Sequence, residues 1–537
     1  MTKAFQASLD VYRDIPLSQK IKEASNMIRK YYIEDERPFV LAYSGGKDSN
    51  ALLYLAMNTL LEMQKDELEL KKEISVVTSN TMAELPPMLR QIKKSLNEIK
   101  KFAQKNKLPV KVYEVLPKVK NTLNVQFLGV GMPPPNGSFR WCTDKLKKLP
   151  SDNFIVKHYK GKKGFITLTG SRRAESFDRA SALVNASRAG TDLKFNSRYV
   201  EASNLTPIEH WTVKDVWSYL FMQNNSITDM TFLWDLYSDA SGKESSECSF
   251  VGAGGKEIDE GKIGCGVSRF GCWQCFIVRG EDKALGGLLK SGYKNIDLYV
   301  EYRNWFWNLT QQGWHNVRDV YRHDTFGRKM YLKGGMQNPK FGMTQARGLR
   351  LAIRMASFKR IIKLQSKVKD TLITLDEIIE IQRRWLYEGD LNLTAFKIYV
   401  GDLKVKQDEL NELIEKEFQP LVNKALKFIQ NELSNMADSK EYSKITIQRK
   451  AVQMALGKKV EKQFYPTKDE ECTIRKQWKN GALNHNEQIK AMEEGVIKID
   501  VEQTLFGKNI NRETTPIHLM QSAQVFCEKH EVIDFKA

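Results

Sequence analysis

Apolar side chains follow two different spacings along the first 225 residues. Short apolar runs typical of buried strands occupy residues 39–43, 74–77, 110–115 and 164–168. Apolar residues at helical spacing come before and between these runs, at about 15–35, 50–63 and 86–105. Strands that alternate with helices form parallel sheets covered on both faces. We therefore predict an α/β fold with a doubly wound, mostly parallel sheet.

The pattern changes after about residue 225, where strand signals fade. A glycine- and cysteine-rich stretch runs from Cys248 to Gly280, and mostly helical stretches follow it. One of these helices is predicted to begin at the capping box Thr374-Leu375-Asp376-Glu377. A chain of 537 residues is long enough for two or three domains. We expect an α/β domain over 1–225, a cysteine-rich segment over 226–285 and a basic helical region over 286–537.

Composition is typical of a globular protein, with 41% hydrophobic and 28% charged residues. No run of eighteen apolar residues is present, and the first residues lack the apolar stretch of a signal peptide. We therefore expect a cytoplasmic protein with no membrane partner. Seven cysteines in such a chain do not indicate a disulfide framework.

The net charge of +19 favours a polyanionic partner, and nucleic acid before a membrane. From Arg318 to Lys369 fourteen Lys or Arg residues stand against two acidic ones. Seven of the basic residues recur at steps of one to five, so many are expected on one side of a helix: Arg347, Arg350, Arg354, Lys359, Arg360, Lys363 and Lys367. Contact with DNA phosphates is one interpretation, and a solvated basic face is the other. We expect the preceding Trp305, Trp307 and Trp314 to be core residues.

The strongest chemical signal is the segment Ser44-Gly45-Gly46-Lys47-Asp48-Ser49, between a predicted strand and a predicted helix. Two glycines allow a tight turn whose amides face a phosphate, and a helix N-terminus adds its positive dipole. Lys47 supplies a cation, and the two serines supply hydroxyl groups. The segment is not a Walker A loop, because Leu41 stands where that loop needs glycine. An ordinary glycine turn is the alternative interpretation.

This segment resembles the loop of the N-type ATP pyrophosphatases, which have an adenine nucleotide alpha hydrolase-like fold and split ATP between its α and β phosphates. The resemblance implies ATP and a bridging Mg²⁺. Later segments are similar to the phosphoadenosine-phosphosulfate-reductase-like branch of that group. They are Thr81–Pro86, Phe139–Thr143 with Leu146-Lys147, Gly170–Ser176 with Arg179, and Pro207-Ile208 followed by Trp211-Thr212 and Asp215–Trp217. Members commonly carry Asp-Thr after the second strand, where this chain has Asn80-Thr81, so a metal or ribose role there is not carried over.

Two further segments resemble a narrower family, the DNA phosphorothioation sulfurtransferases that form the C component of the Dnd system. They are Gly131–Pro135 and the cysteine segment from Cys265 to Cys275. That resemblance implies a four-iron four-sulfur cluster and DNA as the substrate. It also implies a cysteine desulfurase as sulfur donor and other phosphorothioation-system subunits as partners.

Five cysteines are candidate metal ligands. Cys272 and Cys275 are three residues apart, within reach of one metal centre, and Cys265 lies seven residues upstream of Cys272. Cys248 and Cys142 compete for the fourth place. Thiolates suit zinc as well as iron–sulfur clusters, and the resemblance favours the cluster, with a structural zinc as the alternative. If Cys142 is not a ligand, it is free to carry a persulfide.

The expected catalytic residues are Lys47, Asp48, Arg172, Arg173 and Cys142, and Gly170 joins the loop in binding the nucleotide. We expect Arg172 and Arg173 to stabilise charge that develops on phosphate. The function that follows is ATP-dependent sulfur transfer to a DNA phosphate. A reductase of adenylylsulfate or phosphoadenylylsulfate is the second interpretation, and a non-catalytic nucleotide-sensing, DNA-binding scaffold is the third.

Overall fold

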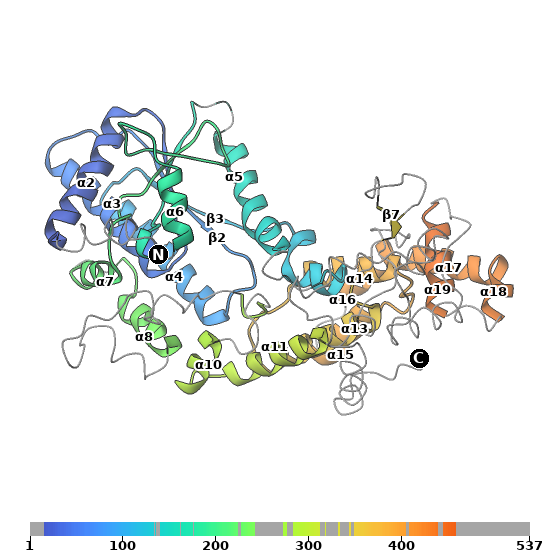
Figure 1. The fold of residues 1–537 in the computed structure, drawn as a ribbon. Coiled ribbons are helices and arrows are strands. Elements are labelled where there is room, and N and C mark those ends of the chain that lie inside the picture. Colours follow the sequence, from blue (N-terminus) through green and yellow to red (C-terminus); the bar gives the residue numbers. More distant parts are fainter. Residues whose placement is uncertain are drawn as a thin grey trace, which may run out of the picture. The chain divides into compact units, whose positions relative to one another are not determined.

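The computed structural model describes residues 15–133, 135, 140–159, 161, 163–175, 177–223, 227–241, 272–275, 283–311, 317, 331–332, 343–344, 348–403, 408–438 and 444–457. The chain forms two compact units. The first contains residues 1–117, 143–273 and 280–296, and the second contains residues 118–142, 274–279 and 297–537. A large sheet lies in the first unit, whereas the second is mainly helical (Figure 1).

The first unit is built around a six-stranded sheet in the order β3-β2-β1-β4-β6-β5. Its strands are β1 (Phe39–Ala42), β2 (Ile74–Ser79), β3 (Val110–Val115), β4 (Ile166–Leu168), β5 (Lys194–Phe195) and β6 (Ser203–Leu205). Every neighbouring pair is parallel except β5 with β6 at the edge. The predicted α/β class with a mostly parallel sheet is therefore confirmed.

The direction of winding reverses between β1 and β4. From β1 the chain proceeds to β2 and β3 on one side, and β4 and β6 lie on the other. In open α/β sheets, ligands bind beyond the carboxyl ends of the strands at such a switch point. The loops that follow β1 and β4 are thus the first places to look for a binding site.

Successive residues of each strand point to opposite faces of the sheet, where they join two separate cores. Phe39 and Leu41 of β1 belong to the larger cluster, and Val40 between them belongs to the smaller one. The same alternation places Val112 of β3 in the larger cluster and Val115 in the smaller. Both faces are therefore buried, as a doubly wound sheet requires.

Side chains from helices pack against the strand residues in both hydrophobic clusters. The larger cluster includes residues of α2 (Leu17–Glu34), α3 (Lys47–Lys65), α4 (Pro86–Lys105), α7 (Val213–Phe221) and α8 (Met230–Ser241). The smaller one includes Phe154 of α5 (Leu149–Tyr159). The helices predicted near 15–35, 50–63 and 86–105 are confirmed as α2, α3 and α4. Among the described residues, this unit also contains the helices η3 (Thr143–Lys148), η4 (Arg173–Glu175), α6 (Phe177–Asn185) and α10 (Lys283–Lys290).

The second unit is predominantly helical, as predicted. Its larger helices are α11 (Ile296–Gln311), α13 (Leu351–Val368), α14 (Leu375–Tyr387), α15 (Thr394–Leu403), α17 (Gln419–Asn431) and α19 (Lys444–Ala455). Shorter elements are η1 (Val119–Asn121), η2 (Val125–Gly129), β7 (Tyr331–Leu332), β8 (Met343–Thr344), α16 (Asp408–Leu413), η6 (Ile414–Phe418) and α18 (Ser434–Asp438). The capping box is confirmed: the Thr374 hydroxyl accepts from the Glu377 amide, and the Glu377 carboxylate accepts from the Thr374 amide. No helix in the described parts of either unit is long and apolar enough to cross a membrane.

Residues 118–142 belong to the second unit, although the sequence pattern groups them with the first domain. The Trp385 indole donates to the Leu128 carbonyl at 2.6 Å, and the Asn124 amide donates to the Leu372 carbonyl at 2.9 Å. The Phe127 ring packs edge-on against Phe306. These partners are distant in sequence, so a local pattern does not reveal them.

The basic residues of α13 divide between the core and the surface. Arg354 is 1% exposed, forms an ion pair with Glu388 and donates to the Leu349 carbonyl, so its predicted place on a DNA-facing stripe is wrong. Arg360 lies over the Trp305 ring at 4.3 Å, and Trp305 is buried, as expected for a core residue. Arg347 lies outside the described residues. Among the described members, Lys359, Lys363 and Lys367 are exposed, and they recur every fourth residue on one face of the helix.

Candidate functional site

The segment Ser44–Ser49 forms a tight turn at the carboxyl end of β1. Gly45 adopts φ +74°, a left-handed conformation that favours glycine, and Gly46 is the N-cap of α3. The Asn50 side chain donates to the Gly45 and Gly46 carbonyls at 3.0 and 3.1 Å and accepts from the Tyr43 hydroxyl at 3.0 Å. The hydrogen bonds of Asn50 therefore stabilise the turn. They leave the N-terminus of α3 at the switch point of the sheet, and a helix N-terminus favours a bound anion.

The loop after β4 packs directly on this turn. A side chain at Gly170 would place its Cβ 2.8 Å from the Asp48 carbonyl oxygen, so the approach of the two backbones requires glycine. Arg172 is 1% exposed and donates from Nε to Asp48 Oδ1 at 2.7 Å and from Nη1 to the Trp211 carbonyl at 3.1 Å. Burial favours the neutral form of Asp48, but Arg172 and Lys47 outweigh it and hold the pKa of this carboxyl below its usual value.

Lys47 is 7% exposed and lies between an acid and an aromatic ring. Its Nζ is 3.1 Å from Asp48 Oδ2 and 5.2 Å from the centroid of the Tyr237 ring of α8. A hydrogen bond links the Tyr237 phenol to the Lys47 backbone, and burial raises the pKa of the phenol. Tyr237 thus contacts both the backbone and the side chain of the lysine expected to meet phosphate.

Arg173 contacts another carboxylate, that of the buried Glu209 in the loop after β6. Its Nε donates to Glu209 Oε1 at 2.6 Å, and its backbone amide donates to the Glu209 carbonyl at 2.9 Å. The other carboxylate oxygen of Glu209 receives Lys194 Nζ at 2.9 Å and the Thr206 hydroxyl at 3.0 Å. Burial opposes ionisation of Glu209, but the hydrogen bonds from Lys194 and Arg173 keep its pKa below the usual value.

Cys272 lies next to the segment that follows β2. Residues Cys272 and Glu84 form an isolated antiparallel bridge, and the Trp273 amide donates to the Ala83 carbonyl at 3.0 Å. Cys272 Sγ is 3.5 Å from Thr81 Oγ1. Because β2 and β1 are parallel neighbours, this thiol lies at the same edge of the sheet as the glycine turn.

The other candidate cysteines fall elsewhere. Cys142 and Cys275 belong to the second unit, where the Cys275 carbonyl accepts from Arg303 Nη2 at 3.2 Å. Cys248 and Cys265 lie outside the described residues. No disulfide joins the three described cysteines, and no group of three or more His, Cys, Asp or Glu side chains among the described residues is arranged to hold a metal ion.

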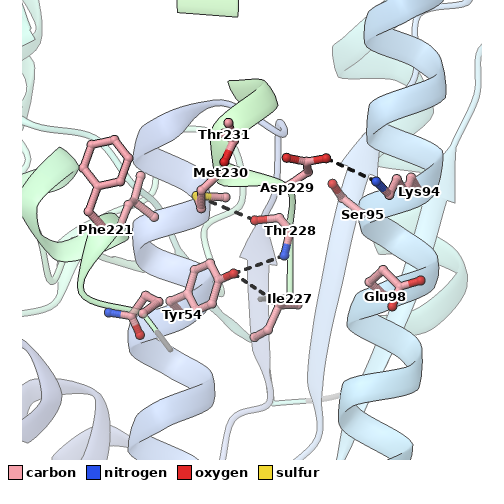
Figure 2. A pocket seen from close by; sticks show the side chains of 12 residues that line it. Tyr54, Lys94, Ser95, Glu98, Phe221, Ile227, Thr228, Asp229, Met230 and Thr231 are labelled. Carbon is pink, nitrogen blue, oxygen red and sulfur yellow. Dashed lines mark hydrogen bonds and ion pairs between the residues drawn. The ribbon is translucent and has the colours of Figure 1, made fainter. Parts of the chain in front are cut away.

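A separate hollow of about 490 Å³ lies beside α3 and α4 in the first unit (Figure 2). The Tyr54 hydroxyl accepts from the Ile227 and Thr228 amides at its wall, and Lys94 forms an ion pair with Asp229 at 3.2 Å. None of the residues that the sequence predicts to bind a nucleotide lines this hollow. The hollow is therefore distinct from the candidate nucleotide site at the carboxyl ends of the strands.

Residues 38–276 match the family model of the phosphoadenosine phosphosulfate reductase domain. The expected resemblance to that reductase-like group is thereby confirmed for these residues, whereas the narrower likeness to the DNA phosphorothioation sulfurtransferases stays a prediction. The match contains the glycine turn, both arginines and Cys272.

Two curated relatives come from Methanocaldococcus jannaschii, the uncharacterized proteins MJ0066 and MJ0973. They are 25% and 28% identical over 42% and 39% of this chain. The chain spans 38% and 44% of the length of these two relatives. Among solved structures, the U34-tRNA thiolase NcsA from Methanococcus maripaludis with its [4Fe-4S] cluster is similar to this chain at 12% identity. The similarity covers 54% of this chain and 80% of that one, with a TM-score of 0.26.

The structure brings together most of the residues that the sequence selects. The glycine turn, Gly170 and Arg172 are in contact, and Arg173 follows in the same loop. Arg172 differs from expectation in one respect: its guanidinium is bound to Asp48 and a carbonyl, so its charge acts on the turn itself. Sequence reasoning missed Tyr237 and Glu209. The available signal for Glu209 was an acidic residue between the quoted pairs Pro207-Ile208 and Trp211-Thr212, and Tyr237 had no such signal.

Proposed function

We propose that this chain is an ATP pyrophosphatase that activates a phosphate oxygen by adenylation and then directs a sulfur nucleophile to it. The observation that carries the proposal is the position of the Ser44–Ser49 turn at the switch point of the sheet, fixed by the Arg172–Asp48 ion pair. Lys47 and the N-terminus of α3 supply the positive charge that a triphosphate needs. The match of residues 38–276 to the reductase domain supports the same class of chemistry.

The first step uses groups at the turn. An acceptor phosphate oxygen attacks the α-phosphorus of ATP, the bond to the bridging oxygen of the β-phosphate breaks, and pyrophosphate leaves. The acceptor is then an adenylate, and a sulfur nucleophile that attacks its phosphorus displaces AMP. Bound Mg²⁺ would neutralise pyrophosphate as it leaves. Arg172 orients Asp48 and the turn, and Arg173 supplies a cation for the phosphate on which charge develops.

The sulfur is proposed to come from the cysteine set. Cys272 lies at the same edge as the turn, beside Thr81, and the spacing of Cys265, Cys272 and Cys275 suits a thiolate-bound centre. We propose a four-iron four-sulfur cluster there, with Cys142 or Cys248 as the fourth ligand and structural zinc as the alternative. Thiolate sulfur matches both metals, and the resemblance favours iron.

DNA is the proposed acceptor. The exposed Lys359, Lys363 and Lys367 form a basic stripe on α13, and such a stripe binds nucleic-acid phosphates in a salt-dependent way. A cysteine desulfurase would supply sulfur, together with other phosphorothioation-system subunits. The second candidate is reduction of a sulfonucleotide, favoured by the name of the matched domain.

One experiment separates these candidates. The anaerobically purified chain is incubated with a cysteine desulfurase, radiolabelled cysteine, ATP and a DNA duplex, and in parallel with adenylylsulfate or phosphoadenylylsulfate and a thiol reductant. ATP-dependent labelling of DNA supports sulfur transfer. Sulfite from the sulfonucleotide without labelled DNA supports the reductase. A chain that does neither, and leaves ATP intact, behaves as a scaffold.

A further inference from the structure

Glu209 contacts two cations on opposite sides of its carboxylate. Its side chain is 8% exposed, and Oε1 accepts from Arg173 Nε at 2.6 Å while Oε2 meets Lys194 Nζ at 2.9 Å. The two cations come from different places: Arg173 follows β4, and Lys194 begins the edge strand β5. A buried carboxylate with two partners of this kind is held in one orientation.

The loop after β6 holds both arginines that follow β4. The Glu209 side chain and carbonyl bind Arg173, and the Trp211 carbonyl accepts from Arg172 at 3.1 Å. Arg172 in turn binds Asp48 at the glycine turn. A continuous set of hydrogen bonds therefore runs from β6 through the arginines to α3, all within the first unit.

Arg173 is not fully engaged by this arrangement. Glu209 accepts from its Nε and backbone amide, and within the described residues no hydrogen bond is formed by its Nη1 or Nη2. The side chain is 17% exposed, so its outer edge reaches solvent. The connected cluster carries four cations and two carboxylates, namely Lys47, Arg172, Arg173 and Lys194 with Asp48 and Glu209. Of these cations, Arg173 keeps Nη donors that a phosphate group can accept from.

We propose that Glu209 is a positioning residue for the nucleotide, which fixes the Arg173 guanidinium so that its free Nη edge meets a phosphate group of ATP. The inference rests on the proposed function, since it takes ATP as the ligand of the turn. Lys194 has a different role, because its Nζ also donates to the Leu183 carbonyl of α6 at 3.5 Å and to Ser187 Oγ just beyond that helix at 3.1 Å, which connects α6 to the edge of the sheet. Loss of Lys194 leaves the Glu209–Arg173 pair in place.

The test is calorimetric binding of a non-hydrolysable ATP analogue to the full chain, with thermal unfolding measured on the same samples. Glu209→Gln should weaken binding about tenfold, because Arg173 then no longer holds its charge-assisted hydrogen bond to the phosphate group. Arg173→Gln should weaken it by at least as much, and the double variant no further than Arg173→Gln alone. Lys194→Met is the matched control, because it removes a buried partner of the same carboxylate, and it should leave the affinity within twofold.

If Glu209→Gln fails to fold, Glu209→Gln combined with Lys194→Met removes one cation with the carboxylate and restores the charge balance. This variant should fold and still bind the analogue about tenfold more weakly. Wild-type affinity in any folded Glu209→Gln variant would overturn the positioning role. So would additive losses when Glu209→Gln is combined with Arg173→Gln. Absence of analogue binding by the unchanged chain would instead overturn the nucleotide site itself.

Discussion

Arg172 Nε lies 2.7 Å from Asp48 Oδ1, and this ion pair joins the loop after β4 to the first turn of α3. Arg172 is 1% exposed, so the contact is made almost without water on the arginine side. The pair closes the switch point of the sheet, because β4 and β1 are the strands between which the winding reverses. Placement of the glycine turn therefore depends on a residue more than 120 positions away in the sequence.

Arg172→Met should destabilise the first unit by about 3 kcal/mol, because it leaves Asp48 with one of its two cations in a desolvated place. Urea unfolding checks this. Arg198→Met is the matched control: Arg198 also pairs with an aspartate, Asp152, but both side chains are 34% exposed. It should cost no more than about 1 kcal/mol. Equal losses of unfolding free energy for the two variants would show that the burial of Arg172 does not strengthen its ion pair.

Gly170→Ala should destabilise the chain by about 1–3 kcal/mol and weaken nucleotide binding, because the added Cβ would lie 2.8 Å from the Asp48 carbonyl oxygen. Backbone atoms on both sides leave little room for adjustment. Gly286→Ala in α10 is the control, since no atom lies within 4 Å of its added Cβ. It should stabilise the helix by about 0.5–1 kcal/mol. A neutral Gly170→Ala variant in thermal unfolding would contradict the close approach.

His210 makes stability depend on pH. Burial lowers the pKa of its imidazole from 6.5 to about 4, with Arg173 and Lys194 acting in the same direction and Glu209 opposing them. Between pH 6.5 and about 4 the unfolded chain therefore binds the extra proton, so stability is fully present above pH 6.5 and falls as the pH decreases to about 4. The loss is on the order of 3 kcal/mol.

The measurement is the free energy of unfolding at several pH values for the unchanged chain and His210→Gln. The two curves should run parallel above pH 7. Below pH 6.5 the variant should lose less stability, since it has no imidazole to protonate in the unfolded state. Curves that stay parallel down to pH 4 would show that His210 is not shielded from protonation.

Metal content tests the cysteine assignment. The anaerobically purified chain should be brown and contain about four irons and matching sulfide. Cys272→Ser and Cys275→Ser should each lose most of the iron, and Cys472→Ser, a cysteine outside the cluster in sequence, should keep it. Zinc at one equivalent without iron would replace the cluster by a structural site and require another sulfur carrier.

Much of the first unit could be predicted from the sequence, because its long elements have clear periods. Helix α4 and strand β3 have the predicted bounds, and α3 begins three residues before its predicted start because the Gly46 N-cap lies within the glycine motif. Strands β5 and β6 have two and three residues, too few for a period to appear. Their positions depend on pairing with β4 and with each other.

Contacts between segments distant in sequence could not be predicted from local residue patterns. Arg354 belongs to a regular series of basic residues, yet its guanidinium satisfies carbonyls and Glu388 inside the second unit. Charge spacing does not distinguish a buried arginine from an exposed one. Tyr237 likewise reaches Lys47 only because α8 returns to the start of α3.

Products formed from ATP labelled at the α-phosphate test the central claim most directly. The chain, Mg²⁺, DNA and a sulfur donor are incubated with the label, and AMP is separated from ADP. We predict labelled AMP with pyrophosphate from the unchanged chain and from Lys71→Ala, which removes an exposed lysine that pairs with Glu69. Lys47→Ala should form none. Labelled ADP with inorganic phosphate, or undiminished AMP from Lys47→Ala, would contradict cleavage between the α and β phosphates at this turn.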